Sequence, residues 1–306
     1  MRTQSIIGSL LALLLGTSAL ADQSGLAAAD AFLRRQGAHV AARELSMAEK
    51  TSLGRALQTP NRTLDDHVIA GVLKNPVAWR PGPEGRELLR SIIHALPEVA
   101  TVPGAQRSLS HATHPEPSNF RGFGFEAIAT AALHRYREPN GDQPRVLRMS
   151  SDVIGRDGKC YESDGCVMFN GADSRQRLVT MKSVKSPAAL RRSVGKAMSQ
   201  LYLRNNLEPG ERQPGILMLG YSDPAVLEAA RCRDWRAAAE RSGAKLLVLA
   251  VHQLTGQVTR LASETPSGTR PREPFQRRAP RMGPTGRAPQ RQWGSRPVRT
   301  PFRRPR

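Results

Sequence analysis

Apolar residues in the first third of the chain recur at spacings of three and four, which is typical of amphipathic helices. Between residues 22 and 100 this spacing runs through short segments that are rich in alanine and leucine. None of these segments has the residue types or the spacing of a chemical site. We therefore expect residues 22–100 to form a small helical subdomain with a supporting or docking role.

Residues 101–120 are polar and contain proline, which predicts a linker. The histidines of its HATH sequence, His111 and His114, are interpreted as part of a solvated loop rather than as metal ligands.

The pattern changes after this linker, where apolar residues alternate or run continuously over short stretches. The predicted elements are a helix over 123–137, strands over 146–154, 159–169 and 178–184, a helix from 186, a strand over 215–221, a helix over 223–242 and a strand over 245–252. Helices and strands in this order predict one mixed sheet with helices on both faces, an α/β domain over 121–260. We expect the strands at 178–184 and 215–221 to be central, because each has a near-continuous apolar face.

Polar side chains interrupt two of the predicted strands at alternate positions. Glu162 and Asp164 share one face of the first strand because residues i and i+2 point the same way. Thr180 and Lys182 share a face of the next strand for the same reason. If the strands pair, these polar groups converge.

The order of these motifs resembles the PD-(D/E)XK phosphodiesterase superfamily, which has the restriction-endonuclease-like fold. The glutamate of that family's first helix is matched by Glu126 in GFGFEAIATAAL. Its metal-binding aspartate is matched best by Asp164 in YESDGCVMFNG, and Asp152 in SSDVIG is the competing match. Lys182 matches the lysine of the acid-x-lysine motif, and Gln200 matches the glutamine of the following helix.

The resemblance implies a nuclease-type active site that binds Mg²⁺ or Mn²⁺. Phosphodiester hydrolysis uses such ions, which prefer oxygen ligands, to neutralise the phosphate and activate water, and a nearby lysine stabilises the developing charge. The candidate catalytic residues are Asp164, Lys182, Gln200 and Glu126, and the candidate metal ligands are Asp164, Glu162 and Asp152.

The chain departs from the family at Thr180, which stands where the family has an acid or glutamine before the lysine. A neutral hydroxyl replaces a carboxylate ligand poorly. Either another acid substitutes, with Glu162 the best candidate, or the domain binds nucleic acid without cutting it.

Positive charge is concentrated at the C-terminus. The chain has a net charge of +20, and residues 270–306 contribute +11 of it through 12 arginines, no lysine and one acid. Together with eight prolines in the same segment, this composition cannot build a core, so we expect a disordered basic tail over 261–306.

Arginine-rich segments bind polyphosphates through counterion release, without sequence choice. The predicted partner is therefore nucleic acid, with an anionic envelope polymer or lipid, or a spacer role for the tail, as the alternatives. The candidate binding residues are Lys185, Arg191, Arg192, Lys196, Arg277, Arg278, Arg303 and Arg304.

The N-terminus has the pattern of a signal peptide. Arg2 precedes a short apolar run over 6–15, and Ala19 and Ala21 form a small-x-small cleavage signal. The run is too short to span a membrane, and no later segment has the length or apolarity to do so. We expect residues 1–21 to be removed and the mature protein to be secreted or periplasmic.

The three cysteines leave two alternatives open. Cys160 and Cys166 could clamp a hairpin loop. If 159–169 is instead one strand, they lie roughly 20 Å apart, beyond disulfide reach, so Cys232 pairs with one of them or all three remain thiols.

The sequence thus supports two functions, an exported metal-dependent nuclease and a non-catalytic binding module on the same fold.

Overall fold

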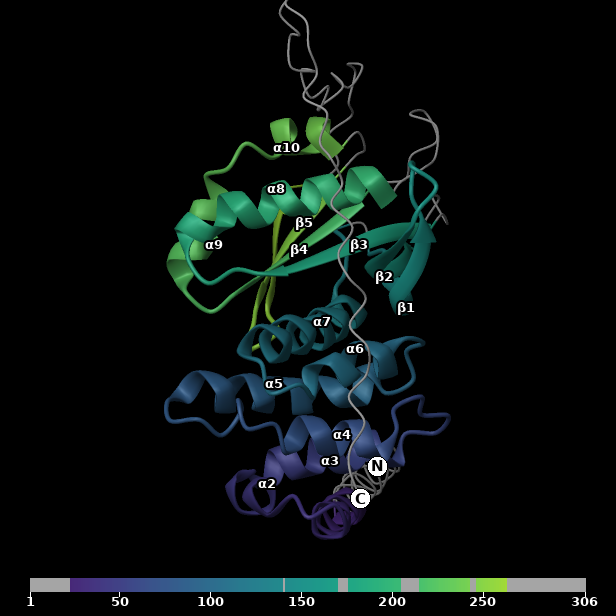
Figure 1. Ribbon diagram of the computed structural model, residues 1–306, viewed down its shortest axis with the longest axis vertical. Coiled ribbons are helices and arrows are strands. Elements are labelled where there is room, and N and C mark those ends of the chain that lie inside the picture. Colours follow the sequence, from purple (N-terminus) through teal and green to yellow (C-terminus); the bar gives the residue numbers. More distant parts are fainter. Residues whose placement is uncertain (1–22, 140, 170–175, 205–214, 243–245, 263–306) are drawn as a thin grey trace, which may run out of the picture. The chain divides into compact units, whose positions relative to one another are not determined.

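The computed structural model describes residues 23–139, 141–169, 176–204, 215–242 and 246–262 (Figure 1). The expected signal peptide and nearly all of the expected basic tail lie outside these ranges. None of the described helices is both long and apolar enough to cross a membrane.

The N-terminal half of the described chain is helical, as the apolar spacing predicts. Its helices are 23–35, α2 (His39–Glu44), α3 (Met47–Gln58), α4 (Asp66–Leu73), α5 (Pro83–Val99), α6 (Ala105–Ala112) and α7 (Pro117–Arg135). The expected linker over 101–120 is not a loop, because it contains α6 and the first turn of α7. His111 accordingly lies in a helix, where its ring stacks on Phe123 with 4.7 Å between centroids.

The C-terminal half forms one six-stranded sheet with strand order β1-β2-β3-β4-β5-β6. Its elements are β1 (Pro144–Ile154), β2 (Cys160–Phe169), β3 (Gln176–Ser183), α8 (Pro187–Arg204), β4 (Gly215–Tyr221), α9 (Pro224–Arg231), α10 (Trp235–Ser242), β5 (Leu246–His252) and β6 (Val258–Ala262). β3, β4 and β5 are parallel to one another, and the other neighbouring pairs are antiparallel. The predicted α/β class, mixed sheet and central positions of β3 and β4 are confirmed.

Two elements differ from the sequence prediction. The single helix expected over 223–242 is two helices, because Asp234 accepts a hydrogen bond from the Ala237 N–H (3.0 Å) at the start of α10. The sequence pattern predicts no strand at β6, because residues 258–260 carry no predicted element and residues 261–262 fall in the predicted tail. Its five residues gain their strand conformation by pairing with β5.

The two faces of the sheet are covered by different helices (Figure 1). Val179, Met218 and Leu249 belong to the core on the α7 side. Leu217 and Val248 alternate with them and pack with α8, α9 and α10. Burial of both faces explains why β4 and β5 read as continuous apolar runs.

The helical half and the sheet share one core. Buried side chains from the N-terminal helices, α7 and the inner face of the sheet form a single cluster. α7 lies close to β4 because Gly220 has no side chain, and a Cβ at that position would be 2.5 Å from the Phe125 ring. The helical residues expected to be a separate subdomain therefore pack directly behind the sheet.

Cys160 and Cys166 lie on the single strand β2, and both are free, as is Cys232. The extended-strand alternative for this segment is confirmed.

Candidate active site at the fork of β2 and β3

β2 and β3 pair over only part of their lengths and then diverge. Their pairing runs from Met168 and Gln176 to Gly165 and Val179. Beyond that point β3 continues beside β4, while β2 continues beside β1. The divergence opens a fork in the middle of the sheet.

Asp164 lies at this fork, one residue past the last β2–β3 pair. Its Oδ2 accepts hydrogen bonds from the Met181 backbone N–H at 2.7 Å and from Lys182 Nζ at 3.2 Å. Beyond the fork the Met181 N–H has no acceptor in the backbone of β2, and the Asp164 carboxylate accepts its hydrogen bond instead. The interaction fixes Asp164 beside Lys182, as the sequence predicts for strands that pair.

A cavity of about 220 Å³ lies at the fork. It is lined by Phe123, Glu126, Ser150, Glu162, Asp164, Gln200 and Arg204. Four of these residues were selected from the sequence: Glu126, Glu162, Asp164 and Gln200. The structure therefore brings together side chains from α7, β2 and α8, with Lys182 of β3 in contact with Asp164.

Glu126 reaches the cavity from α7 and accepts a hydrogen bond from Ser108 Oγ at 2.6 Å. Burial, together with the negative charge of Asp164, raises the pKa of Glu126 to about 8, although Ser108 and Lys182 oppose the shift. Glu126 is therefore mostly protonated at neutral pH.

Glu162 is held by two neighbours. Its Oε1 is hydrogen-bonded to Ser150 Oγ and lies 3.3 Å from Arg107 Nε. Ser150 has a left-handed backbone (φ 44°), which is unusual for a residue with a side chain.

Asp152 does not line the cavity. Its side chain is exposed and binds the guanidinium of Arg107, with Nη1 to oxygen distances of 3.0 and 3.1 Å. Of the two candidate matches for the metal-binding aspartate, only Asp164 lies among the other candidate residues.

Arg204 lies at the fork beside Thr180 and Asp164. Its Nη1 lies 3.5 Å from the hydroxyl of the fully buried Thr180 and 3.7 Å from Asp164 Oδ1. Sequence reasoning missed this residue. Its signal was present, because the apolar stripe of α8 through Leu201 continues to Arg204 three residues later. An arginine on a buried stripe requires a polar partner inside the fold.

The donor types around the cavity suit a hard divalent cation. Glu126, Glu162 and Asp164 supply carboxylate oxygens, and Gln200 supplies a buried amide oxygen that accepts no hydrogen bond among the described residues. In the described ranges, however, no three acidic, histidine or cysteine side chains form a group that could hold a metal ion. Positive charge beside Asp164 comes instead from Lys182 and Arg204.

The basic residues selected from the sequence fall into three groups. Arg191, Arg192 and Lys196 are exposed on α8, which contains no acidic residue. Lys185 lines a separate cavity of about 210 Å³ at the carboxyl ends of β3, β4 and β5. The four tail arginines, Arg277, Arg278, Arg303 and Arg304, lie outside the described residues.

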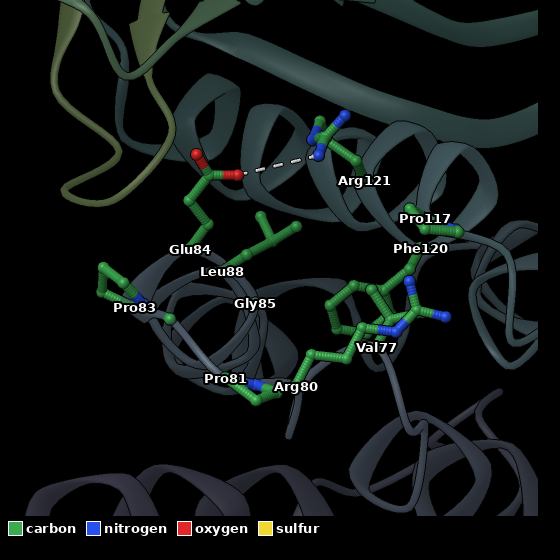
Figure 2. Close-up of a pocket in the computed structure, with 11 residues that line it drawn as sticks. Val77, Arg80, Pro81, Pro83, Glu84, Gly85, Leu88, Pro117, Phe120 and Arg121 are labelled. Carbon is green, nitrogen blue, oxygen red and sulfur yellow. Dashed lines mark ion pairs between the residues drawn. The ribbon is translucent and has the colours of Figure 1, made fainter.

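A larger cleft of about 370 Å³ lies between the first turns of α5 and α7. Figure 2 shows its proline-rich wall and the ion pair between Arg121 and Glu84, which are 3.8 Å apart. Glu84 is its one acidic lining residue, and its side chain is 89% exposed. We favour the smaller cavity as the candidate site because catalysis by acid, base or metal needs several polar groups that face one another.

Comparisons of this chain with protein-family models, with curated proteins and with solved structures return no match.

Proposed function

We propose that this protein is a divalent-cation-dependent phosphodiesterase of the PD-(D/E)XK type that acts on nucleic acid through an altered active site. One observation carries the proposal. Glu126, Asp164 and Gln200 line one cavity, and Lys182 binds Asp164 at its edge. These are the four residues that the resemblance selects, and they come from four separate elements.

Glu162 compensates for the acid that is missing at Thr180. It shares a strand face with Asp164 and lines the same cavity. Asp164, Glu162 and Glu126 would hold Mg²⁺ or Mn²⁺, which when bound neutralises the phosphate and activates water. Lys182 stabilises the charge that develops on the phosphate during attack.

The substrate class follows from charge. The exposed cations of α8 lie on the helix that supplies Gln200 and Arg204 to the site, so a polyanion bound along α8 approaches the cavity. The arginines of 270–306 add sequence-independent attraction. With residues 1–21 as a signal peptide, the protein acts outside the cytoplasm, as a secreted or periplasmic enzyme.

The test is cleavage of DNA and RNA by the mature chain in Mg²⁺ or Mn²⁺, with a chelator as the metal-free arm. Asp164→Asn and Lys182→Met should each lower the cleavage rate by roughly 100-fold or more, because each removes charge from the reacting centre. Asp30→Asn is a charge-matched control, since Asp30 pairs with Lys50 in the helical half. Cleavage that persists unchanged in Asp164→Asn would overturn the site assignment.

A second candidate function, a non-catalytic module that binds nucleic acid or an anionic envelope polymer, is favoured by Arg204. Its guanidinium supplies Asp164 with a permanent cation, which leaves less need for a metal ion. In this case wild-type protein binds polyanions without cleaving them. Deleting 270–306 should then weaken binding and its salt dependence while leaving thermal unfolding unchanged.

A further inference from the structure

A second polar cavity lies at the carboxyl ends of the three parallel strands. Its volume is about 210 Å³, and the strands contribute Ser183 of β3, Ser222 after β4 and Gln253 after β5. Open α/β sheets commonly bind ligands just beyond the carboxyl ends of their strands. Among the described residues, none lines both this cavity and the one at the fork. What this cavity binds therefore does not depend on the proposed function.

Gln253 connects the three strand ends through a buried amide. Its side-chain Nε2 donates to Ser183 Oγ at 2.6 Å, and its Oε1 accepts a hydrogen bond from Ser222 Oγ at 3.3 Å. Its backbone N–H donates to the Tyr221 carbonyl at 2.8 Å. Because the Ser183 oxygen accepts the amide hydrogen bond, its own O–H is left to donate. The network thus holds a hydroxyl donor in a fixed place on the cavity wall.

Charged groups of both signs line the same cavity. Arg121 of α7 and Lys185, which follows β3, are its cations, and Glu87 of α5 and Asp223 are two of its carboxylates. Within the described chain, the side chains of Lys185 and Glu87 have no ion-pair or hydrogen-bond partner. Arg121 lies 3.8 Å from Glu84, whose side chain is 89% exposed, so this pair is weak. Charges of both signs are therefore available to a ligand.

This mixture of charges limits the ligand. A simple anion is attracted by Arg121 and Lys185 but repelled by Glu87 and Asp223, and a simple cation meets the opposite problem. A molecule that carries one carboxylate and one ammonium complements both sets of charges. The lining therefore favours a zwitterion.

The size and the apolar lining of the cavity limit the ligand further. Its volume of about 210 Å³ is below the roughly 300–1,000 Å³ of sites that hold drug-sized molecules. Leu88, Val184 and Leu254 supply apolar surface beside the charged groups. The ligand is therefore small and has an apolar part.

We propose that this cavity binds a free α-amino acid with an aliphatic side chain. Arg121, Lys185 and the Ser183 hydroxyl bind its carboxylate, and the three apolar residues contact its side chain. Glu87 and Asp223 bind its ammonium. Asp223 Oδ1 accepts a backbone hydrogen bond at the start of α9, which leaves Oδ2 for this contact.

The first experiment is calorimetric titration of the mature protein with L-alanine, L-valine and L-leucine. At least one should bind saturably, with one molecule per chain. The amide of that amino acid lacks the carboxylate, and its N-acetyl derivative lacks the ammonium. Each should bind on the order of 10–100-fold more weakly, because a charged group of the cavity is then left unpaired. Failure of all three amino acids to bind, or equal binding of either derivative, would overturn the proposal.

A dipeptide distinguishes a free amino acid from the end of a peptide, because its ammonium and carboxylate stand on different residues. The homodipeptide of the amino acid that binds best should bind more weakly than the free amino acid. Tighter binding of the dipeptide would show that the cavity receives a peptide end and would overturn the assignment to a free amino acid.

Two substitutions test the charged partners separately. Glu87→Gln should weaken binding of the free amino acid on the order of tenfold, and the disadvantage of the N-acetyl derivative should shrink. Lys185→Gln should weaken the free amino acid similarly and reduce the disadvantage of the amide. Neither side chain belongs to the buried core, so neither change leaves a hole in it. A variant that weakens all three ligands equally would indicate a structural effect and overturn the role assigned to that residue.

Glu44→Gln and Lys74→Gln are the charge-matched controls. Glu44 forms an ion pair and Lys74 donates to a backbone carbonyl, both within the helical half, and neither residue lines the cavity. Both variants should bind the amino acid as wild type does. A loss equal to that in Glu87→Gln and Lys185→Gln would show that only net charge matters and would contradict a specific site.

Discussion

Arg204 Nη1 lies 3.5 Å from the hydroxyl of Thr180, and both side chains are buried at the fork of the sheet. The same guanidinium lies 3.7 Å from Asp164. A cation thus stands beside the position where the resembled family carries an acid. Any carboxylate introduced at residue 180 meets this arginine first.

We therefore expect Thr180→Glu alone to add little metal affinity, because the new carboxylate pairs with Arg204. Combined with Arg204→Met, which fills similar space without charge, the same substitution should strengthen Mn²⁺ binding by roughly tenfold or more, since ligand charge dominates affinity at such sites. Titration calorimetry of both variants and of Arg204→Met alone measures this. Equal affinity in the single and double variants would show that Arg204 does not compete with the metal.

The protonation of Glu126 predicts how stability depends on pH. Its pKa rises from 4.5 to about 8 on folding, so between these values the native protein holds a proton that the unfolded chain has lost. Stability should fall as pH rises through this window and level off above it. Glu126→Gln mimics the protonated form, so it should be more stable than wild type at about pH 9 and similar to it at about pH 4.

Urea unfolding across this pH range measures the effect. Glu84→Gln is the control, because the Glu84 side chain is 89% exposed and should leave the pH profile unchanged. If the free energy of unfolding changed with pH in the same way for Glu126→Gln and wild type, the pKa of Glu126 would be unchanged by folding.

Two glycine-to-alanine substitutions, one at the contact between α7 and β4 and one on α8, should have opposite effects on the free energy of unfolding. Gly220→Ala places a methyl group 2.5 Å from the Phe125 ring, and this overpacking should cost about 1–3 kcal/mol. Gly195→Ala on α8 meets nothing within 4 Å and should stabilise the helix by about 0.5–1 kcal/mol. Chemical denaturation of both variants measures whether each substitution lowers or raises the free energy of unfolding. A neutral Gly220→Ala would show that α7 packs less closely on β4.

The exposed cations of α8 predict how nucleic acid binding responds to salt. Replacing Arg191, Arg192 and Lys196 with glutamine should flatten the slope of log affinity against log salt by up to about 0.9 per lost phosphate contact. Fluorescence anisotropy with labelled DNA measures the slope. The control replaces Arg34, Arg43 and Lys74, three cations of the helical half, which changes the net charge equally. Equal slopes in both variants would indicate that only net charge matters.

Much of the α/β architecture could be read from the chain because it follows from local periodicity. The alternation in β3 placed Thr180 and Lys182 on one face and Val179 and Met181 on the other, and the packing confirms this. The continuous apolar runs of β4 and β5 predicted buried strands in the same way, and β3 and β4 hold the central positions predicted for them. Backbone geometry sets which side chains share a face, so these features need no knowledge of distant contacts.

The sequence alone therefore determined the order of the main elements, the sharing of a face by Glu162 and Asp164, and the basic character of the tail. Three features emerge only from the packing of the folded chain: Arg204 lies beside Thr180, α6 contacts Glu126 and Glu162, and the helices share a core with the sheet. These features join residues far apart in the chain. They depend on how closely whole helices and strands pack against one another. The local pattern of apolar and polar residues does not predict that packing distance.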